Sequence, residues 1–136
     1  MGITGLTVLL LMPLSFAQAP AHKSRVDLGQ EFKIKKGQEV VVRGGTLRIR
    51  FRSVLQDSRC PTGVNCVWAG NGEVAIAVAR SNQKQVVKRL NTSSDPKEIV
   101  YKGFKIKLVA LNPYPKVNRR IARKDYEATM VVTKDE

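Results

Sequence analysis

Apolar and polar side chains alternate along most of the chain after residue 31. The alternation is clearest from residue 47 to residue 52, where leucine, isoleucine and phenylalanine are interleaved with three arginines. Successive side chains of a strand point to opposite faces, so this stretch predicts a strand with an apolar inner face and a row of arginines outside. Shorter stretches with the same period extend the prediction to seven or eight strands. They are residues 32–35, 40–42, 47–54, 74–79, 86–90, 99–101, 104–109 and 126–132.

Turn residues separate these stretches, and no segment has a sustained helical period. The run 74–79 is apolar on both faces, which predicts a central, covered strand. The prolines in the run Asn112-Pro113-Tyr114-Pro115 end the preceding strand, because proline cannot donate to a sheet ladder. Residues 117–123 are predicted to form a basic loop or one helical turn. We therefore expect an all-β fold, an antiparallel β-sandwich or a partly open barrel of seven to eight strands.

The N-terminal segment has the features of a secretory signal. Leu6–Phe16 is mostly apolar, and Ala17-Gln18-Ala19 supplies small residues at the positions that a signal peptidase reads. The apolar run is shorter than the roughly 20 residues that a membrane-spanning helix needs. We predict a signal peptide at residues 1–19, a flexible lead-in at 20–30 that contains His22, and a single β domain at 31–136. The expected location is secreted or periplasmic.

The connection between the strands at 47–54 and 74–79 holds both cysteines and the only tryptophan of the chain. Two cysteines in an exported protein predict one disulfide, between Cys60 and Cys66. A redox pair is the other reading, but redox cysteines usually lie two residues apart at the start of a helix, and this spacing differs. The disulfide is therefore expected to be structural and to fix this connection locally.

Two parts of this connection resemble a known signature. Asp-Ser-Arg-Cys-Pro at residues 57–61 and Cys-Val-Trp-Ala-Gly-Asn at residues 66–71 are similar to a motif of small secreted or lipid-anchored bacterial proteins whose function is not established. The resemblance implies an exported all-β domain with a Cys60–Cys66 disulfide, and it brings no catalytic residues. The lipid-anchoring cysteine of that group is absent here.

Individual residues of the motif allow two interpretations. Asp57 is suited to accept backbone N–H groups in a turn, and Arg59 to pair with Asp57 or Glu73 or to project outward. Trp68 is expected to cover the disulfide or to cap the end of the barrel. In the functional interpretation the connection is a rigid recognition loop that presents Arg59 and Trp68. In the structural interpretation it is only a corner of the fold, which the architecture of small β domains favours.

The charge is the strongest functional signal, at a formal +13 and a pI of about 10.2. Such a surface attracts polyanions. If the basic strand faces and the basic loop adjoin, they form an anion-binding groove for a glycan or for lipid head groups; otherwise they are a solvated surface that keeps an exported protein soluble. Export and the lack of interleaved aromatic residues argue against a specific nucleic acid partner. The candidate anion-binding residues are Arg48, Arg50, Arg52, Lys105, Lys107, Arg119, Arg120 and Arg123.

Signals of catalysis are weak. His22 falls in the expected lead-in, where a general base would not be held in reach of its proton. No histidine, cysteine and aspartate cluster has metal-ligand spacing, and no glycine-rich phosphate loop precedes a helix. We therefore expect a non-enzymatic binding or envelope-associated module without metal or cofactor, with an anionic surface or a protein as its partner. The alternative is a proteinaceous enzyme inhibitor that presents the Cys60–Cys66 loop. The oligomeric state stays open.

Overall fold

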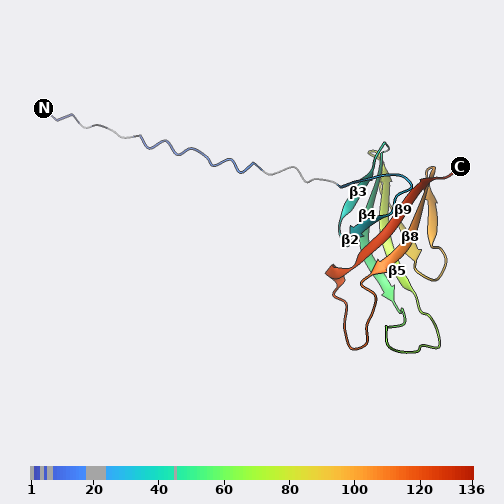
Figure 1. The fold of residues 1–136 in the computed structure, drawn as a ribbon. Coiled ribbons are helices and arrows are strands. Elements are labelled where there is room, and N and C mark those ends of the chain that lie inside the picture. Colours follow the sequence, from blue (N-terminus) through green and yellow to red (C-terminus); the bar gives the residue numbers. More distant parts are fainter. Residues whose placement is uncertain (1, 4, 6–7, 18–23, 45) are drawn as a thin grey trace.

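The chain folds into a β-sandwich (Figure 1). The structure is a computed structural model that describes residues 2–3, 5, 8–17, 24–44 and 46–136. Its regular elements within these residues are strands and one short 3-10 turn. They are β1 (Ser24–Val26), β2 (Phe32–Lys35), β3 (Glu39–Val42), β4 (Leu47–Asp57), β5 (Gly72–Arg80), β6 (Val86–Asn91), β7 (Glu98–Tyr101), β8 (Phe104–Asn112), η1 (Arg123–Asp125) and β9 (Glu127–Lys134).

Two sheets face each other across the core. The five-stranded sheet has the order β1-β3-β4-β5-β6, and the four-stranded sheet has the order β2-β9-β8-β7. Neighbouring strands are antiparallel, apart from β1 and β3, which are parallel. The predicted all-β sandwich is therefore confirmed. The predicted strands all form, and several extend a few residues beyond the alternating stretch.

The core follows the alternation in the sequence. Leu47, Ile49 and Phe51 are fully buried, as the arginine-interleaved pattern predicts. On β5, the small residues Ala75 and Ala77 point outward and are still buried, with 5% and 3% of their surface exposed. Register explains this burial, because arginines of the neighbouring strands lie beside the alanines: Arg50 opposite Ala77 on β4 and Arg89 opposite Ala75 on β6. Their long aliphatic stems cover the alanines while the charges stay in water.

A β-bulge changes the face of the residues in the second half of β4. The register with β5 shifts between Phe51 and Ser53, so Arg52 is the extra residue and Val54 returns to the core side. A second shift follows between Val54 and Gln56. The short strand β3 ends its pairing near Phe51, and no other described strand pairs with β4 beyond that point on this side. The C-terminal part of β4 therefore has a free edge, which the two bulges make irregular and less suited to pairing with another strand.

The expected flexible lead-in at 20–30 is wrong for residues 24–30. Strand β1 pairs with β3, Val26 and Leu28 pack against the core, and the Gly29 N–H donates a 2.8 Å hydrogen bond to the Val132 carbonyl. The three residues of β1 are too few for a period to appear, and their pairing depends on a partner strand elsewhere in the chain. Residues 20–23, His22 included, lie outside the described residues.

The apolar N-terminal run lies apart from the sandwich. Residues 8–17 have no regular structure and lead away from the domain in Figure 1. Their large side chains are exposed, for example Leu11 at 88% and Phe16 at 87%. Within the described residues, no helix has the length and apolar character to cross a membrane. The signal peptide stays a prediction.

Two long connections extend from one end of the sandwich, at the bottom of Figure 1. Residues 58–71 join β4 to β5, and residues 113–126 join β8 to β9. We call the part of the molecule formed by these two connections the loop end. The C-terminus lies at the opposite end.

Candidate functional site

Arg59 fastens the loop end to both sheets. Its guanidinium donates two hydrogen bonds to the Asp57 carboxylate, at 2.7 Å from Nε and 2.8 Å from Nη2. It also donates to the carbonyls of Leu111 and Pro113, where β8 ends, and lies 5.2 Å from the centre of the Tyr114 ring. Because Arg59 is only 7% exposed, it is a structural residue. It pairs with Asp57, as one of the sequence interpretations expected, and it is not presented for recognition.

Tyr126 completes this arrangement, which we call the Arg59 cluster (Asp57, Arg59 and Tyr126). The Tyr126 hydroxyl donates a 2.8 Å hydrogen bond to Asp57 Oδ2. Burial by itself raises the pKa of the Asp57 carboxyl, but the hydrogen bonds from Arg59 and Tyr126 and the Arg59 charge bring it below the ordinary 3.8. Burial, the hydrogen bond to Asp57 and the charge of that carboxylate raise the pKa of Tyr126 from 10.0 to about 12. At neutral pH the cluster therefore holds an ionised carboxylate and a neutral phenol.

The next motif residues close the base of the 58–71 connection. The Ser58 N–H donates to the Asn71 carbonyl at 2.8 Å, and the Asn71 N–H donates to Ser58 Oγ at 3.0 Å. The Cys60 N–H donates to the Ala69 carbonyl at 3.1 Å, which continues the pairing into the connection. Gly70 lies so close to Ser58 that a Cβ at this position would come within 1.8 Å of the Ser58 carbonyl oxygen. Only glycine fits there.

The predicted disulfide is confirmed. Cys60 and Cys66 are bonded, with their Cα atoms 5.8 Å apart, and the described chain has no free cysteine. Structural disulfides of this kind are typical of oxidising, extracellular environments. The closed ring is attached to the other long connection, because the Thr62 N–H donates a 2.9 Å hydrogen bond to the Pro115 carbonyl. The two connections of the loop end therefore support each other.

Trp68 lies in the solvent, not over the disulfide. It is 82% exposed and its neighbour Val67 is 91% exposed. The expectation that Trp68 covers the disulfide or caps the end of the sandwich is therefore wrong. The motif divides into two parts. One part builds the loop and consists of Asp57, Ser58, Arg59, Gly70, Asn71 and the two cysteines. The other part, Val67 and Trp68, is exposed on the loop.

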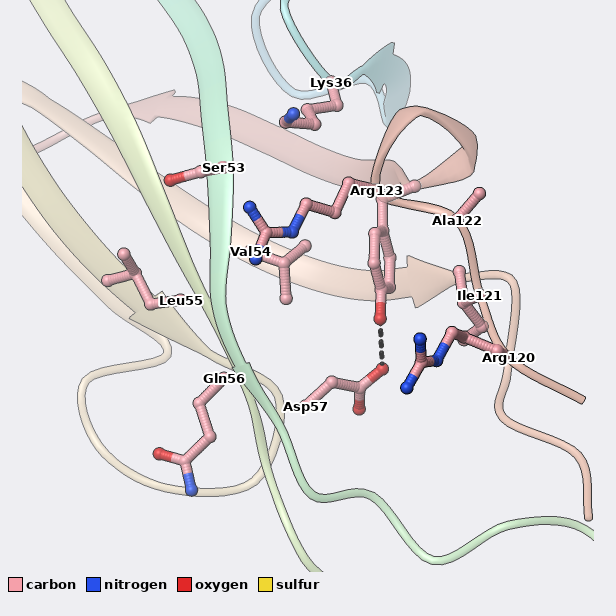
Figure 2. A pocket seen from close by; sticks show the side chains of 11 residues that line it. Lys36, Ser53, Val54, Leu55, Gln56, Asp57, Arg120, Ile121, Ala122 and Arg123 are labelled. Carbon is pink, nitrogen blue, oxygen red and sulfur yellow. Dashed lines mark hydrogen bonds between the residues drawn. The ribbon is translucent and has the colours of Figure 1, made fainter.

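A groove runs beside the free edge of β4. It encloses about 750 Å³ and is lined by Ser53–Asp57 on one side and by Arg120–Arg123 on the other, and Lys36 and Tyr126 complete the lining. Figure 2 shows the Arg120 and Arg123 side chains extending from their segment toward β4 and Asp57. Asp57 is the only acidic residue in the lining, and Arg59 and Tyr126 already hold it. The groove is therefore basic.

The other candidate anion-binding residues do not share this groove. Arg48 and Arg50 lie on the outer face of the five-stranded sheet and pair with Glu39, at 3.5 and 3.7 Å. Arg52 is exposed at the bulge next to them. Lys105 and Lys107 belong to β8, and they alternate with the inward-facing Ile106, so they lie on the outer face of the other sheet.

The prediction of one groove that unites all the basic residues is therefore wrong, because the two basic strand faces lie on opposite sides of the sandwich. Arg119 lines a smaller hollow beside Tyr114 and Lys116. The loop cluster of Arg119, Arg120 and Arg123 is the part of the prediction that the fold brings together with a concave surface.

Lys36 and Tyr126 are site residues that the sequence did not single out. Lys36 lies in a turn and Tyr126 begins the last alternating stretch, so both read locally as ordinary turn and strand residues. In the described residues, no group of three or more histidine, cysteine, aspartate or glutamate side chains is arranged to hold a metal ion. No family model, curated protein or solved structure matches the chain.

Proposed function

We propose that this protein is a non-enzymatic, exported binding module that uses the loop end to bind anionic partners. The observation that carries the proposal is the basic groove. Lys36, Arg120 and Arg123 line it, and none of them forms an ion pair with another described residue. In contrast, Arg48 and Arg50 already have an acidic neighbour in Glu39. Unpaired cations in a concave surface attract an anion more strongly than paired ones on a flat face.

Three features support export. The N-terminal apolar run matches a signal peptide and packs on nothing in the described structure. The Cys60–Cys66 disulfide is typical of an oxidising compartment. The motif resembles that of small secreted or lipid-anchored bacterial proteins. We therefore place the protein outside the cytoplasm, in the secreted or periplasmic space.

The titratable groups of the loop end support a binding role over catalysis. Asp57 is the carboxylate of the groove, and both of its oxygens already accept hydrogen bonds from Arg59 and Tyr126. Its pKa is lowered, which makes it a weak base. The phenol of Tyr126 has a pKa raised to about 12, which makes it a weak acid at neutral pH. The Arg59 cluster is therefore suited to hold the fold together.

Retention on immobilised heparin, an anionic polymer, tests the proposal. Replacing Arg120 and Arg123 with serine removes two charges from the groove. Replacing Lys105 and Lys107 with serine removes the same formal charge from the outer face of the four-stranded sheet. Exposed charge pairs contribute about 0.2–1 kcal/mol each, so we expect the groove variant to bind roughly 2- to 30-fold more weakly. The sheet variant should elute close to the unmodified protein.

Equal elution of the two variants contradicts the proposal. In that case retention reports only net charge, and the groove has no special role. Binding at the groove must also weaken steeply with salt, because exposed charges are screened within about 8 Å at physiological ionic strength.

A second function, as a proteinaceous enzyme inhibitor, is favoured by the shape of the disulfide ring. Val64 inside the disulfide ring is 45% exposed. The Cys60–Cys66 disulfide closes the ring, and the Thr62–Pro115 hydrogen bond fastens it to the neighbouring connection. A preorganised loop loses little entropy on entering an enzyme cleft. Inhibition of a purified hydrolase that persists at high salt, and that is lost when residues 62–65 are replaced, supports this function.

A further inference from the structure

We infer that the loop end docks on an anionic lipid bilayer, with Val67 and Trp68 entering the head-group region and the surrounding cations facing the lipid phosphates. This inference rests on the proposed function and names its partner. It starts from an asymmetry within the motif. Asp57, Ser58, Arg59 and Asn71 have hydrogen-bond partners inside the protein, whereas Val67 and Trp68 lie almost fully in water.

Large apolar side chains gather at this end on both connections. Besides Val67 and Trp68, the exposed ones are Val64 at 45%, Tyr114 at 51% and Val117 at 42%. The Thr62–Pro115 hydrogen bond holds the two connections together, so these side chains belong to one end of the molecule. Tryptophan and tyrosine have an apolar body and a polar group, and they are enriched where a bilayer meets water. The cluster therefore has the chemistry of a membrane interface.

Exposed cations also outnumber unpaired carboxylates at the loop end. The second connection has five exposed basic residues: Lys116, Arg119, Arg120, Arg123 and Lys124. The acidic residues at or beside this end are Asp57 and Glu73, which are already paired with Arg59 and Arg89, and Asp95, Asp125 and Glu127.

The opposite end is also basic, because Arg43, Arg80 and Lys134 line a hollow there. Asp27 pairs with Arg43 at 3.2 Å, and Asp135 and Glu136 follow the end of β9. Charge therefore attracts an anionic surface to either end, and the exposed Val67 and Trp68 favour the orientation with the loop end toward the surface.

A bilayer fits this end better than an acidic peptide does. The free edge of β4 is the feature that an extended peptide would pair with, but two bulges interrupt it between Phe51 and Gln56. Bulges of this kind protect an edge from strand addition. In contrast, a bilayer accepts a protruding tryptophan with flanking cations and needs no matching shape. The disulfide and the Arg59 cluster hold the tip in place, so little order has to be gained on binding.

Trp68 is the only tryptophan of the chain, so its fluorescence reports the position of the tip directly. The experiment mixes the full chain with vesicles of phosphatidylcholine alone or with one third phosphatidylglycerol. With the anionic vesicles we expect the emission to shift to shorter wavelength and acrylamide quenching to fall. With the neutral vesicles both should stay as in buffer.

Co-sedimentation with the same vesicles tests the contribution of the tip. Trp68→Ser and Val67→Ser remove apolar surface that is exposed, so neither should disturb the fold, which circular dichroism checks. We expect Trp68→Ser to weaken binding to anionic vesicles about tenfold. Val100→Ser is the matched control, because Val100 is 52% exposed and lies opposite Lys105 near the other end of the sandwich. All variants keep the apolar residues 8–17, so any binding through that segment is common to them.

The outcomes separate this inference from the proposed function. Sedimentation of the protein without an emission shift, or equal sedimentation of Trp68→Ser and Val100→Ser, overturns the insertion of the tip and leaves anion binding intact. Retention on heparin without binding to anionic vesicles overturns the bilayer as the partner and leaves a soluble or protein-bound polyanion. Absence of binding to both surfaces overturns the proposed function itself.

Discussion

Replacing Arg59 with methionine tests the structural role assigned to the Arg59 cluster. Methionine keeps most of the aliphatic stem and removes the guanidinium. The Asp57 carboxylate then loses both hydrogen bonds from the guanidinium, and the carbonyls of Leu111 and Pro113 lose theirs. The side chains of Arg59 and Asp57 are only 5% and 13% exposed, so water replaces these partners poorly.

The magnitude follows from this burial. Breaking a buried ion pair by removing one partner costs about 3–5 kcal/mol, because the remaining charge is left uncompensated. We expect Arg59→Met to lower the free energy of unfolding by that amount. With an m-value of about 1.5 kcal/mol per M, the midpoint of a urea titration falls by about 2–3 M. Circular dichroism should follow the unfolding, since the exposed Trp68 is a poor probe of the core.

Arg48→Met is the matched control. The Arg48 side chain is 33% exposed, and its partner Glu39 keeps a second arginine in Arg50. A pair this exposed contributes at most about 1 kcal/mol. Equal destabilisation by the two substitutions refutes the role of the Arg59 cluster.

The pH dependence gives a second check on the same variant. The pKa of Asp57 is lowered below 3.8, so its contribution is complete above pH 3.8 and disappears as the pH falls through the value in the folded protein. The difference in stability between the unmodified protein and Arg59→Met should therefore shrink in acid. A difference that stays constant down to pH 2 contradicts the ion pair as its cause.

Three further predictions concern the same end of the molecule. Gly70→Ala should lower the free energy of unfolding by more than about 3 kcal/mol, because the added Cβ would lie 1.8 Å from a backbone oxygen. Gly63→Ala is the control: the space around Gly63 is open, so the substitution should cost only the roughly 1–2 kcal/mol of placing alanine at a positive φ. Folding raises the pKa of Tyr126 from 10.0 to about 12, so its neutral phenol contributes stability that is present below pH 10 and lost as the pH rises through 12. The stability of Tyr126→Phe should lack this loss between pH 10 and 12. Replacing both Cys60 and Cys66 with serine should cost roughly 2.5 kcal/mol in the chain-entropy model and leave the circular dichroism of the sandwich unchanged.

The strands could be predicted because burial imposes a local period. In β4 the alternation of Leu47, Ile49 and Phe51 with arginines is visible in six consecutive residues, and all three apolar residues are buried. The proline at 113 likewise marks the end of β8 at Asn112. These features depend only on neighbours in the chain, so the sequence contains them.

Features that depend on distant partners could not be predicted in the same way. Strand β1 forms because β3 offers a parallel edge, and its three residues have no pattern of their own. Arg59 is buried because the carbonyls at 111 and 113 come from the other sheet to receive it. From the sequence, Arg59 could either pair with an acidic residue or project into solvent. The contact between segments that are distant in the chain decides between these two alternatives.

Trp68 shows the limit of reasoning from residue type. A tryptophan beside a disulfide is usually part of a core, and that expectation placed it over the sulfur atoms. The hydrogen bonds between residues 58–60 and 69–71 make the connection project outward as a paired arm, which carries Trp68 into solvent. The site on the loop end therefore follows from the geometry of the arm and not from the composition of the motif.

The most direct test of binding at the loop end is a map of backbone amide signals by nuclear magnetic resonance during titration with a soluble heparin fragment. We predict that the largest shifts fall on the residues of the groove, at 53–57, 120–126 and Lys36, and that they disappear as salt is added. The strands β7 and β8 should change little between Glu98 and Lys107. Shifts centred on Lys105 and Lys107, or spread evenly over both outer faces, contradict the account.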